Sequence, residues 1–133
     1  MLQRMEYSKF QLYKINDSDI EKEALKPYPF CEPSKFKIFT VINEPAAQVV
    51  FEDWFKGNDT QWSAWTDEIH IAFQGSAEIT IWEPPDLENK ITVIAEAPCV
   101  YLIPIGSRIK WKILSDEPFR QISIDIPNPG FGF

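Results

Sequence analysis

The chain of 133 residues is poor in metal-binding side chains and has no long apolar run. It contains one histidine, His70, and two cysteines, Cys31 and Cys99, which lie far apart and form no metal-type pair. No stretch approaches the roughly 20 apolar residues that cross a bilayer as a helix. Because Met1–Glu6 lacks the apolar middle of a signal peptide, the sequence predicts a cytoplasmic protein.

Basic residues are also scarce. Thirteen lysines and arginines stand against twenty aspartates and glutamates, which gives a formal net charge of −7. A nucleic-acid backbone and an anionic membrane surface both attract a basic face, so the sequence predicts neither as a partner. The balance of 44% hydrophobic and 25% charged residues is ordinary for a globular protein, and the length suits a single domain with its own core.

The sequence divides into an N-terminal arm, residues 1–35, and a β-rich region, residues 36–133. In the arm, a Ser-x-x-Glu capping box predicts a short helix over Ser18–Lys26 that ends at Pro27.

The β-rich region contains short runs of Ile, Val, Phe, Trp and Thr that are separated by turn residues. Such runs at roughly 8–12-residue spacing are typical of an antiparallel sandwich or barrel, so we expect an all-β fold with a minor helix. The predicted strands are Phe36–Ile42, Gln48–Phe55, Glu68–Phe73, Ala77–Trp82, Lys90–Ala95, Val100–Ile103, Arg108–Leu114 and Arg120–Ile126.

One predicted strand alternates clearly between apolar and basic residues. Ile109, Trp111 and Ile113 share one face, whereas Lys110 and Lys112 lie on the other. Because side chains alternate across a strand, we expect the apolar set to point inward and the two lysines to be exposed.

Two groups of residues match a known pair of motifs. Gly57, Glu68 and Gly75 have the spacing of a motif that runs Gly, His-x-His, Glu, Gly, and Pro104–Gly106 forms the Pro-x-Gly turn of a second motif. Their order and separation resemble the cupin superfamily, whose members are small β-barrels. The resemblance covers roughly Phe36–Ile126 and implies a small antiparallel β-barrel of the double-stranded β-helix kind, the cupin jelly roll.

The sequence departs from the cupin pattern at the metal ligands. Counting back from Glu68, Trp62 and Ala64 occupy the two histidine positions of the first motif. The histidine and asparagine positions of the second motif hold Ile109 and Ile113. Three of the four usual ligands are therefore replaced by groups that cannot bind a metal, whereas Fe, Mn and Ni sites need several converging imidazoles or carboxylates. The comparison implies a cupin barrel without a metal or another cofactor.

If Glu68 points into the barrel as in cupins, His70 and Ala72 share its face. Residues two apart on a strand stand about 7 Å apart at Cα, so their side chains can interact. The carboxylate can fix the imidazole tautomer, which makes the pair a candidate acid–base unit. A structural or ligand-orienting role for the pair is the alternative. The sequence leaves open whether Tyr101 and Arg120 face inward.

Tryptophan is abundant for so short a chain, with Trp54, Trp62, Trp65, Trp82 and Trp111. Trp62 and Trp111 fall in or near the position of the missing metal, together with Ile109 and Ile113. Pockets are typically apolar and aromatic with a few polar groups, so these residues suit a flat organic molecule. The alternative is that they simply fill the barrel.

The sequence thus predicts a metal-independent cupin that binds a small aromatic or unsaturated organic compound, with Glu68 and His70 as the catalytic pair. The expected chemistry is isomerisation, elimination or cyclisation, without a cofactor. A non-enzymatic cupin, acting as a ligand sensor or a structural partner, is the alternative. We expect a homodimer, since cupins commonly dimerise and the arm can cover an edge strand of a neighbour. The predicted ligand-binding residues are Trp62, Ala72, Ile109, Trp111 and Ile113.

Overall fold

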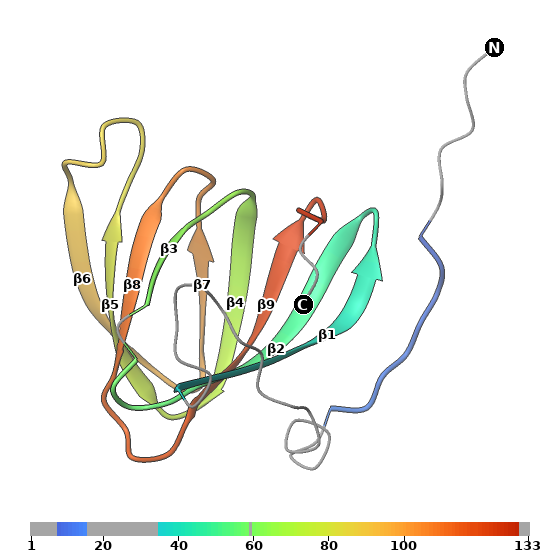
Figure 1. Cartoon of the computed structure of the whole chain (residues 1–133), viewed down its shortest axis with the longest axis horizontal. Coiled ribbons are helices and arrows are strands. Elements are labelled where there is room, and N and C mark those ends of the chain that lie inside the picture. The colour runs from blue at the N-terminus through green and yellow to red at the C-terminus, as the bar shows by residue number, and fades with distance from the viewer. Residues whose placement is uncertain (1–7, 16–34, 59, 131–133) are drawn as a thin grey trace.

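The computed structural model describes residues 8–15, 35–58 and 60–130. The helix expected over Ser18–Lys26 lies outside these residues. The described part contains nine strands and no α-helix (Figure 1). The strands are β1 (Phe36–Glu44), β2 (Ala47–Trp54), β3 (Gln61–Ser63), β4 (Asp67–Gln74), β5 (Ser76–Trp82), β6 (Lys90–Glu96), β7 (Cys99–Ile103), β8 (Arg108–Ile113) and β9 (Phe119–Ile126).

The strands form two antiparallel sheets. One has five strands in the order β1-β2-β9-β4-β7, and the other has four in the order β3-β8-β5-β6. In Figure 1 the four-stranded sheet lies to the left, and the β1–β2 hairpin ends the five-stranded sheet on the right. The all-β antiparallel fold expected from the sequence is confirmed.

All eight predicted strands are present, and their ends differ from the prediction by at most two residues. The sequence did not indicate β3, because three residues are too short to show an alternating pattern. β3 pairs with β8 and sets Trp62 opposite Ile109.

The alternation in β8 has the expected orientation, and the inward residues are each at most 3% exposed: Ile109, Trp111 and Ile113. Lys112 is exposed, as predicted. Lys110 is only half-exposed. It lies in a central strand between Gln61 of β3 and Thr80 of β5, so neighbours flank it on both sides.

Arg120 belongs to the outer face of the five-stranded sheet. Its neighbours along β9, Phe119 and Gln121, are fully buried and point between the sheets. The Arg120 Nε and Nη2 atoms donate hydrogen bonds to Asp53 Oδ1 and Oδ2, each at 2.8 Å, and the two residues are direct partners across β2 and β9. Arg120 therefore ties two strands together and does not reach the space between the sheets.

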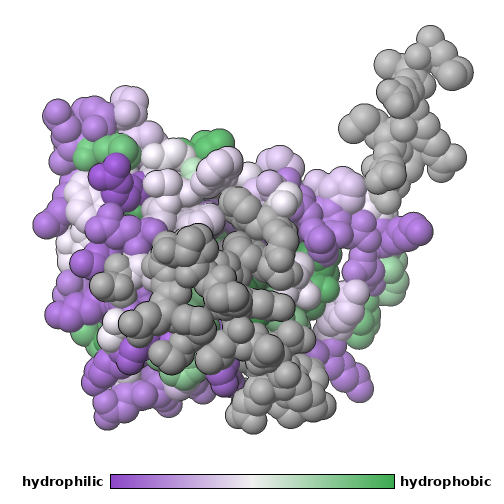
Figure 2. Space-filling view, viewed as in Figure 1, coloured by the Kyte–Doolittle hydropathy of each residue, from purple (hydrophilic) through white to green (hydrophobic). Residues whose placement is uncertain are grey.

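The hydrophobic core fills the space between the two sheets. The described residues on the face seen in Figure 2 are mostly hydrophilic, with apolar residues in separate patches. No helix in the described ranges has the length and apolar character needed to cross a membrane. The core includes Phe36, Ile38, Val50, Trp54, Ala72, Ala77, Ile79, Ile103, Ile109, Trp111, Ile113 and Phe119.

Gly75 connects β4 to β5 and so carries the chain from one sheet to the other. Its φ is +82°, and a Cβ there would lie 2.7 Å from Ser115 Oγ and 2.8 Å from the Pro118 carbonyl oxygen. We expect Gly75→Ala to lower the free energy of unfolding by about 2–5 kcal/mol, from left-handed strain of roughly 1–2 kcal/mol and overpacking of roughly 1–3 kcal/mol.

Gly130→Ala is the matched control for urea denaturation, because Gly130 has a φ of +81° and no atom of the described residues lies within 4 Å of the added Cβ. This substitution introduces the backbone strain of a left-handed φ without a steric clash at the Cβ. It should therefore lower the free energy of unfolding by no more than about 1–2 kcal/mol. Equal losses in the two variants would contradict a steric role for the Gly75 turn.

Candidate functional site

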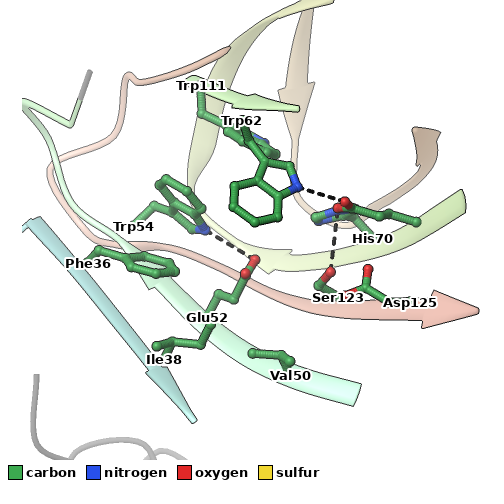
Figure 3. Close-up of a pocket in the computed structure, with 11 residues that line it drawn as sticks. Phe36, Ile38, Val50, Glu52, Trp54, Trp62, His70, Trp111, Ser123 and Asp125 are labelled. Carbon is green, nitrogen blue, oxygen red and sulfur yellow. Dashed lines mark hydrogen bonds and ion pairs between the residues drawn. The ribbon is translucent and has the colours of Figure 1, made fainter. Parts of the chain in front are cut away.

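A small cavity lies between the sheets and combines aromatic walls with titratable side chains (Figure 3). The cavity has a volume of about 30 Å³, which is room for one or a few water molecules. The lining residues come mainly from β1, β2, β4 and β9, with one tryptophan each from β3 and β8. They are Phe36, Ile38, Val50, Glu52, Trp54, Trp62, Glu68, His70, Trp111, Ser123 and Asp125.

Strand β4 places Glu68 and His70 side by side on its inner face. The two side chains are almost completely buried, and Glu68 Oε1 lies 2.9 Å from His70 Nε2. Trp62 Nε1 donates a hydrogen bond of 2.8 Å to the other carboxyl oxygen, Oε2. Ser123 Oγ lies 3.5 Å from the same imidazole nitrogen. The structure thus brings the Glu–His pair into an aromatic-walled cavity.

Two further carboxyl groups, missed by sequence reasoning, face the same cavity. Glu52 comes from β2 and is 8% exposed; Asp125 comes from β9 and is 6% exposed. Glu52 Oε1 accepts hydrogen bonds from Trp54 Nε1 at 3.2 Å and from Gln121 Nε2 at 3.0 Å. Within the described part of the chain, Asp125 Oδ1 is buried and has no hydrogen-bond partner.

The pattern of β9 hides Asp125, because the strand carries its apolar residues on the opposite face. Ile122, Ile124 and Ile126 alternate with Ser123 and Asp125, so periodicity alone would turn the isoleucines inward. The structure does the reverse, with Asp125 buried and Ile126 50% exposed. In β2 apolar residues occur on both faces, which leaves the orientation of Glu52 undetermined by sequence.

Burial and crowding alter the acidity of this group. Burial raises the pKa of Glu52 to about 7, and the negative charge of Glu68 adds to the effect. The pKa of Asp125 also rises to about 7, because of burial and then the charges of Glu68 and Glu52. For His70, burial lowers the pKa, but the hydrogen bond with Glu68 and the nearby carboxylates outweigh it, so the pKa is raised. The cavity therefore retains protons near neutral pH.

Tyr101 faces inward behind His70, which answers the question the sequence left open. Its ring stacks on the imidazole with centroids 4.9 Å apart and planes 11° from parallel. The Tyr101 hydroxyl donates to Gln121 Oε1 and accepts a hydrogen bond of 3.0 Å from Trp111 Nε1. Because burial raises its pKa well above the usual value, Tyr101 stays a neutral donor. Through Gln121 it supports Glu52.

The aromatic rings pack on one another. Trp54 and Trp111 stack with their ring centroids 4.8 Å apart, and the ring centroids of Phe36 and Trp54 are 4.3 Å apart. The ring centroids of Trp111 and His70 are 5.9 Å apart, so the Trp111 ring packs between Trp54 and the imidazole. Trp62 is partly exposed, which leaves it as the ring best placed to meet a molecule from outside.

The structure places the predicted ligand-binding residues in different surroundings. Trp62 and Trp111 line the cavity, whereas Ala72 and Ile113 are core residues that do not. Ile109 lines a second, larger cavity of about 260 Å³ beneath β6 and β7. Along β8, Trp111 lies between Ile109 and Ile113. The second cavity is lined by aliphatic side chains with Cys99 and Tyr101, and none of the described residues that line it carries a carboxyl or imidazole group.

Comparisons with known proteins agree with this architecture: it is the jelly roll of the cupin fold. KdgF from Halomonas sp. superposes with a TM-score of 0.61 at 14% identity over 73% of this chain and 83% of that chain. An RmlC-like cupin with a double-stranded β-helix fold from Methanocaldococcus jannaschii gives 0.59 at 11% identity, over 69% and 80%. The oxalate decarboxylase of Lactobacillus farciminis gives 0.63 at 20% identity, over 80% of this chain and 32% of that chain.

The sequence matches no protein-family profile and no curated protein. The jelly-roll expectation is confirmed by the structural comparisons.

The residues present do not fit a metal ion. Across residues 8–15, 35–58 and 60–130, no group of three or more His, Cys, Asp or Glu side chains is arranged to hold one. Ala64 and Ile109, which stand where metal-binding cupins have histidines, are buried and apolar. One oxygen of Glu68 is already bonded to the Trp62 indole.

We expect the purified protein to contain far less than one transition metal ion per chain, because the imidazoles that would hold the ion are missing. Elemental analysis after expression with added Fe, Mn, Ni and Zn measures this directly. One tightly held equivalent that survives mild chelation would contradict the assignment of this site as metal-free.

The buried carboxyl groups should make the folded state less stable as pH rises. Glu52 and Asp125 titrate near pH 7 when folded but near their ordinary values of 4.5 and 3.8 when unfolded. Between about pH 4 and 7 the folded chain therefore binds more protons than the unfolded chain. Its free energy of unfolding falls as pH rises, by up to about 1.4 kcal/mol per pH unit for each additional proton bound. The raised pKa of His70 acts in the same direction, since its contribution is present below 6.5 and is lost above its folded value.

Glu52→Gln should flatten this slope, since the amide oxygen can still accept both hydrogen bonds while the ionisable group is gone. Urea denaturation from pH 4 to pH 8 should show the variant gaining stability relative to wild type as pH rises. The exposed Glu88→Gln is the charge-matched control and should leave the slope unchanged. An unchanged slope in Glu52→Gln would show that Glu52 does not titrate in this range.

Proposed function

We propose that the chain is a metal-independent cupin that binds a small organic compound in this cavity and transfers a proton to or from it. The observation that carries the proposal is that Glu52, Glu68, His70 and Asp125 line one cavity with aromatic walls. Two of these carboxyl groups have a pKa of about 7, which suits an acid–base catalyst at neutral pH.

Each residue has a role that follows from its contacts. Glu68 holds the His70 imidazole through the 2.9 Å contact with Nε2, which fixes its orientation. A protonated His70 can stabilise negative charge that develops on the ligand. Glu52 or Asp125 takes or gives the proton, since each is close to half-protonated at neutral pH. Isomerisation, elimination and cyclisation all include such a transfer, and none of them requires a metal here.

The aromatic walls favour a ligand with a planar, aromatic or unsaturated part. Because the space behind the mouth is small, only a compact polar group can enter beside the carboxyl groups. The planar part then rests against Trp62 at the mouth. The cupin neighbours support this proposal only at the level of the fold, since one fold hosts unrelated chemistries.

A non-enzymatic cupin, either a ligand sensor or a structural partner, is the second candidate function. Both oxygens of Glu68 already have partners, and Glu52 is held by Trp54 and Gln121. Such a connected polar network can orient a ligand without any reaction.

His70→Ala distinguishes the two functions. The wild-type protein is incubated with a bacterial metabolite extract, and mass spectrometry records which compounds disappear or form. We expect at least one conversion, and we expect His70→Ala and His70→Gln to slow it by roughly 10²–10⁴-fold while ligand affinity changes much less. Ile71→Ala is the control, because Ile71 is the next residue of β4 and points outward.

Conversion by all variants at the wild-type rate would remove His70 from the mechanism. Binding of a metabolite without conversion by the wild-type protein would favour the sensor.

A further inference from the structure

The cavity carries an excess of negative charge. Glu52, Glu68 and Asp125 are opposed by a single imidazole, His70, and all four are at most 8% exposed. Buried charges are stable only when they are paired and hydrogen-bonded. When all three carboxyl groups are ionised, a protonated His70 balances only one of them. The cavity therefore needs either bound protons or a bound cation.

One carboxyl oxygen points to the kind of group that is accepted. Among the described residues, Asp125 Oδ1 is buried without a hydrogen-bond partner, although Asp125 lines the cavity. An ionised carboxylate can only accept hydrogen bonds, so its missing partner must be a donor. In Figure 3, Glu52 and Asp125 approach the cavity from the adjacent strands β2 and β9.

The remaining walls are aromatic. Trp54 and Trp62 border the cavity together with Phe36. The negative face of an aromatic ring attracts a cation, most strongly for tryptophan, and the attraction grows when the cation loses water. Carboxyl groups on one side and indole rings on the other are both complementary to an organic cation, whereas a fully hydrated metal ion would gain nothing from the rings.

We propose that the ligand carries a primary or secondary ammonium group, which binds among Glu52, Glu68 and Asp125 and contacts the rings of Trp54 and Trp62. This assignment rests on the proposed function, because it assumes that the cavity is a ligand site. It adds the chemical class of the ligand: a small amine with a planar part at the mouth.

Binding of the ammonium group should release protons. Glu52 from β2 and Asp125 from β9 share the cavity with Glu68 and His70 from β4, and Tyr101 from β7 reaches Glu52 only through Gln121. A cation beside the carboxylates favours their ionised form. Affinity should therefore rise from pH 5 to pH 8, by up to about tenfold per pH unit for each proton released.

The first test compares benzylammonium, benzyl alcohol and benzoate, which have similar shapes but different charges. Isothermal titration calorimetry at pH 7.5 should show that benzylammonium binds at least tenfold more tightly than benzyl alcohol and that benzoate does not bind. Repeating the benzylammonium titration in buffers of different ionisation enthalpy measures proton release.

Equal affinity for benzylammonium and benzyl alcohol would overturn the ammonium assignment and leave the proposed function standing. Failure of all three probes, together with no metabolite binding, would overturn both. Displacement of benzylammonium by millimolar Ca²⁺ or Mg²⁺ would instead assign the carboxyl groups to an inorganic cation.

The second test uses Asp125→Asn and Glu52→Gln, which keep the shape of the side chain and remove its charge. Each substitution should lower the affinity for benzylammonium at least fivefold, while the affinity for benzyl alcohol stays within twofold of wild type. Glu88→Gln makes the same change in net charge at an exposed site and should leave both affinities unchanged. Equal weakening by Glu88→Gln would mean that overall charge, and not this cavity, attracts the amine. If Asp125→Asn fails to fold, Glu52→Gln alone decides the outcome.

Discussion

The packing of three carboxyl groups around one imidazole governs the interior of this protein. Glu52, Glu68 and Asp125 come from three strands of one sheet, and they meet His70 in a space with little water. Burial, and after it the negative charge of the neighbouring carboxylates, raises the pKa of Glu52 and of Asp125 to about 7, so these two groups keep their protons up to about that pH. The hydrogen bonds from the indole N–H groups and from Gln121 hold the acids in place, and the same shortage of positive charge makes the cavity receptive to a cationic ligand.

Two tryptophans contact the Glu–His pair in the cavity. Trp62 stands at a position where the cupin motif has a histidine, and its N–H binds the glutamate that the motif retains, Glu68. The indole thus gives one oxygen of this carboxylate a hydrogen-bond donor. Trp111 packs between Trp54 and His70 and lines the cavity. The chemistry we propose for this cavity accordingly depends on proton transfer and charge.

The cupin fold by itself does not assign a function. Structures that share it with this chain include KdgF and an oxalate decarboxylase, and their sequences are at most 20% identical to this one. What distinguishes this chain is the set of side chains that line its smaller cavity. The larger cavity beneath β6 and β7 has more volume, but none of the described residues that line it is an acid or a histidine.

The sequence alone predicted eight of the nine strands in the described residues and the inward face of β8, because these depend on local alternation. Single residues also showed that Trp62, Ala64 and Ile109 stand at the histidine positions of the cupin motifs. The sequence also paired Glu68 with His70, since residues two apart on a strand must share a face. Only the tertiary structure revealed Glu52 and Asp125 as members of the site. Their strands carry apolar side chains on the outer face as well, and in β9 the isoleucines face outward while Asp125 is buried. A binary pattern reports which face is more apolar, whereas the packing of two sheets decides which face is enclosed, and here it enclosed the polar one.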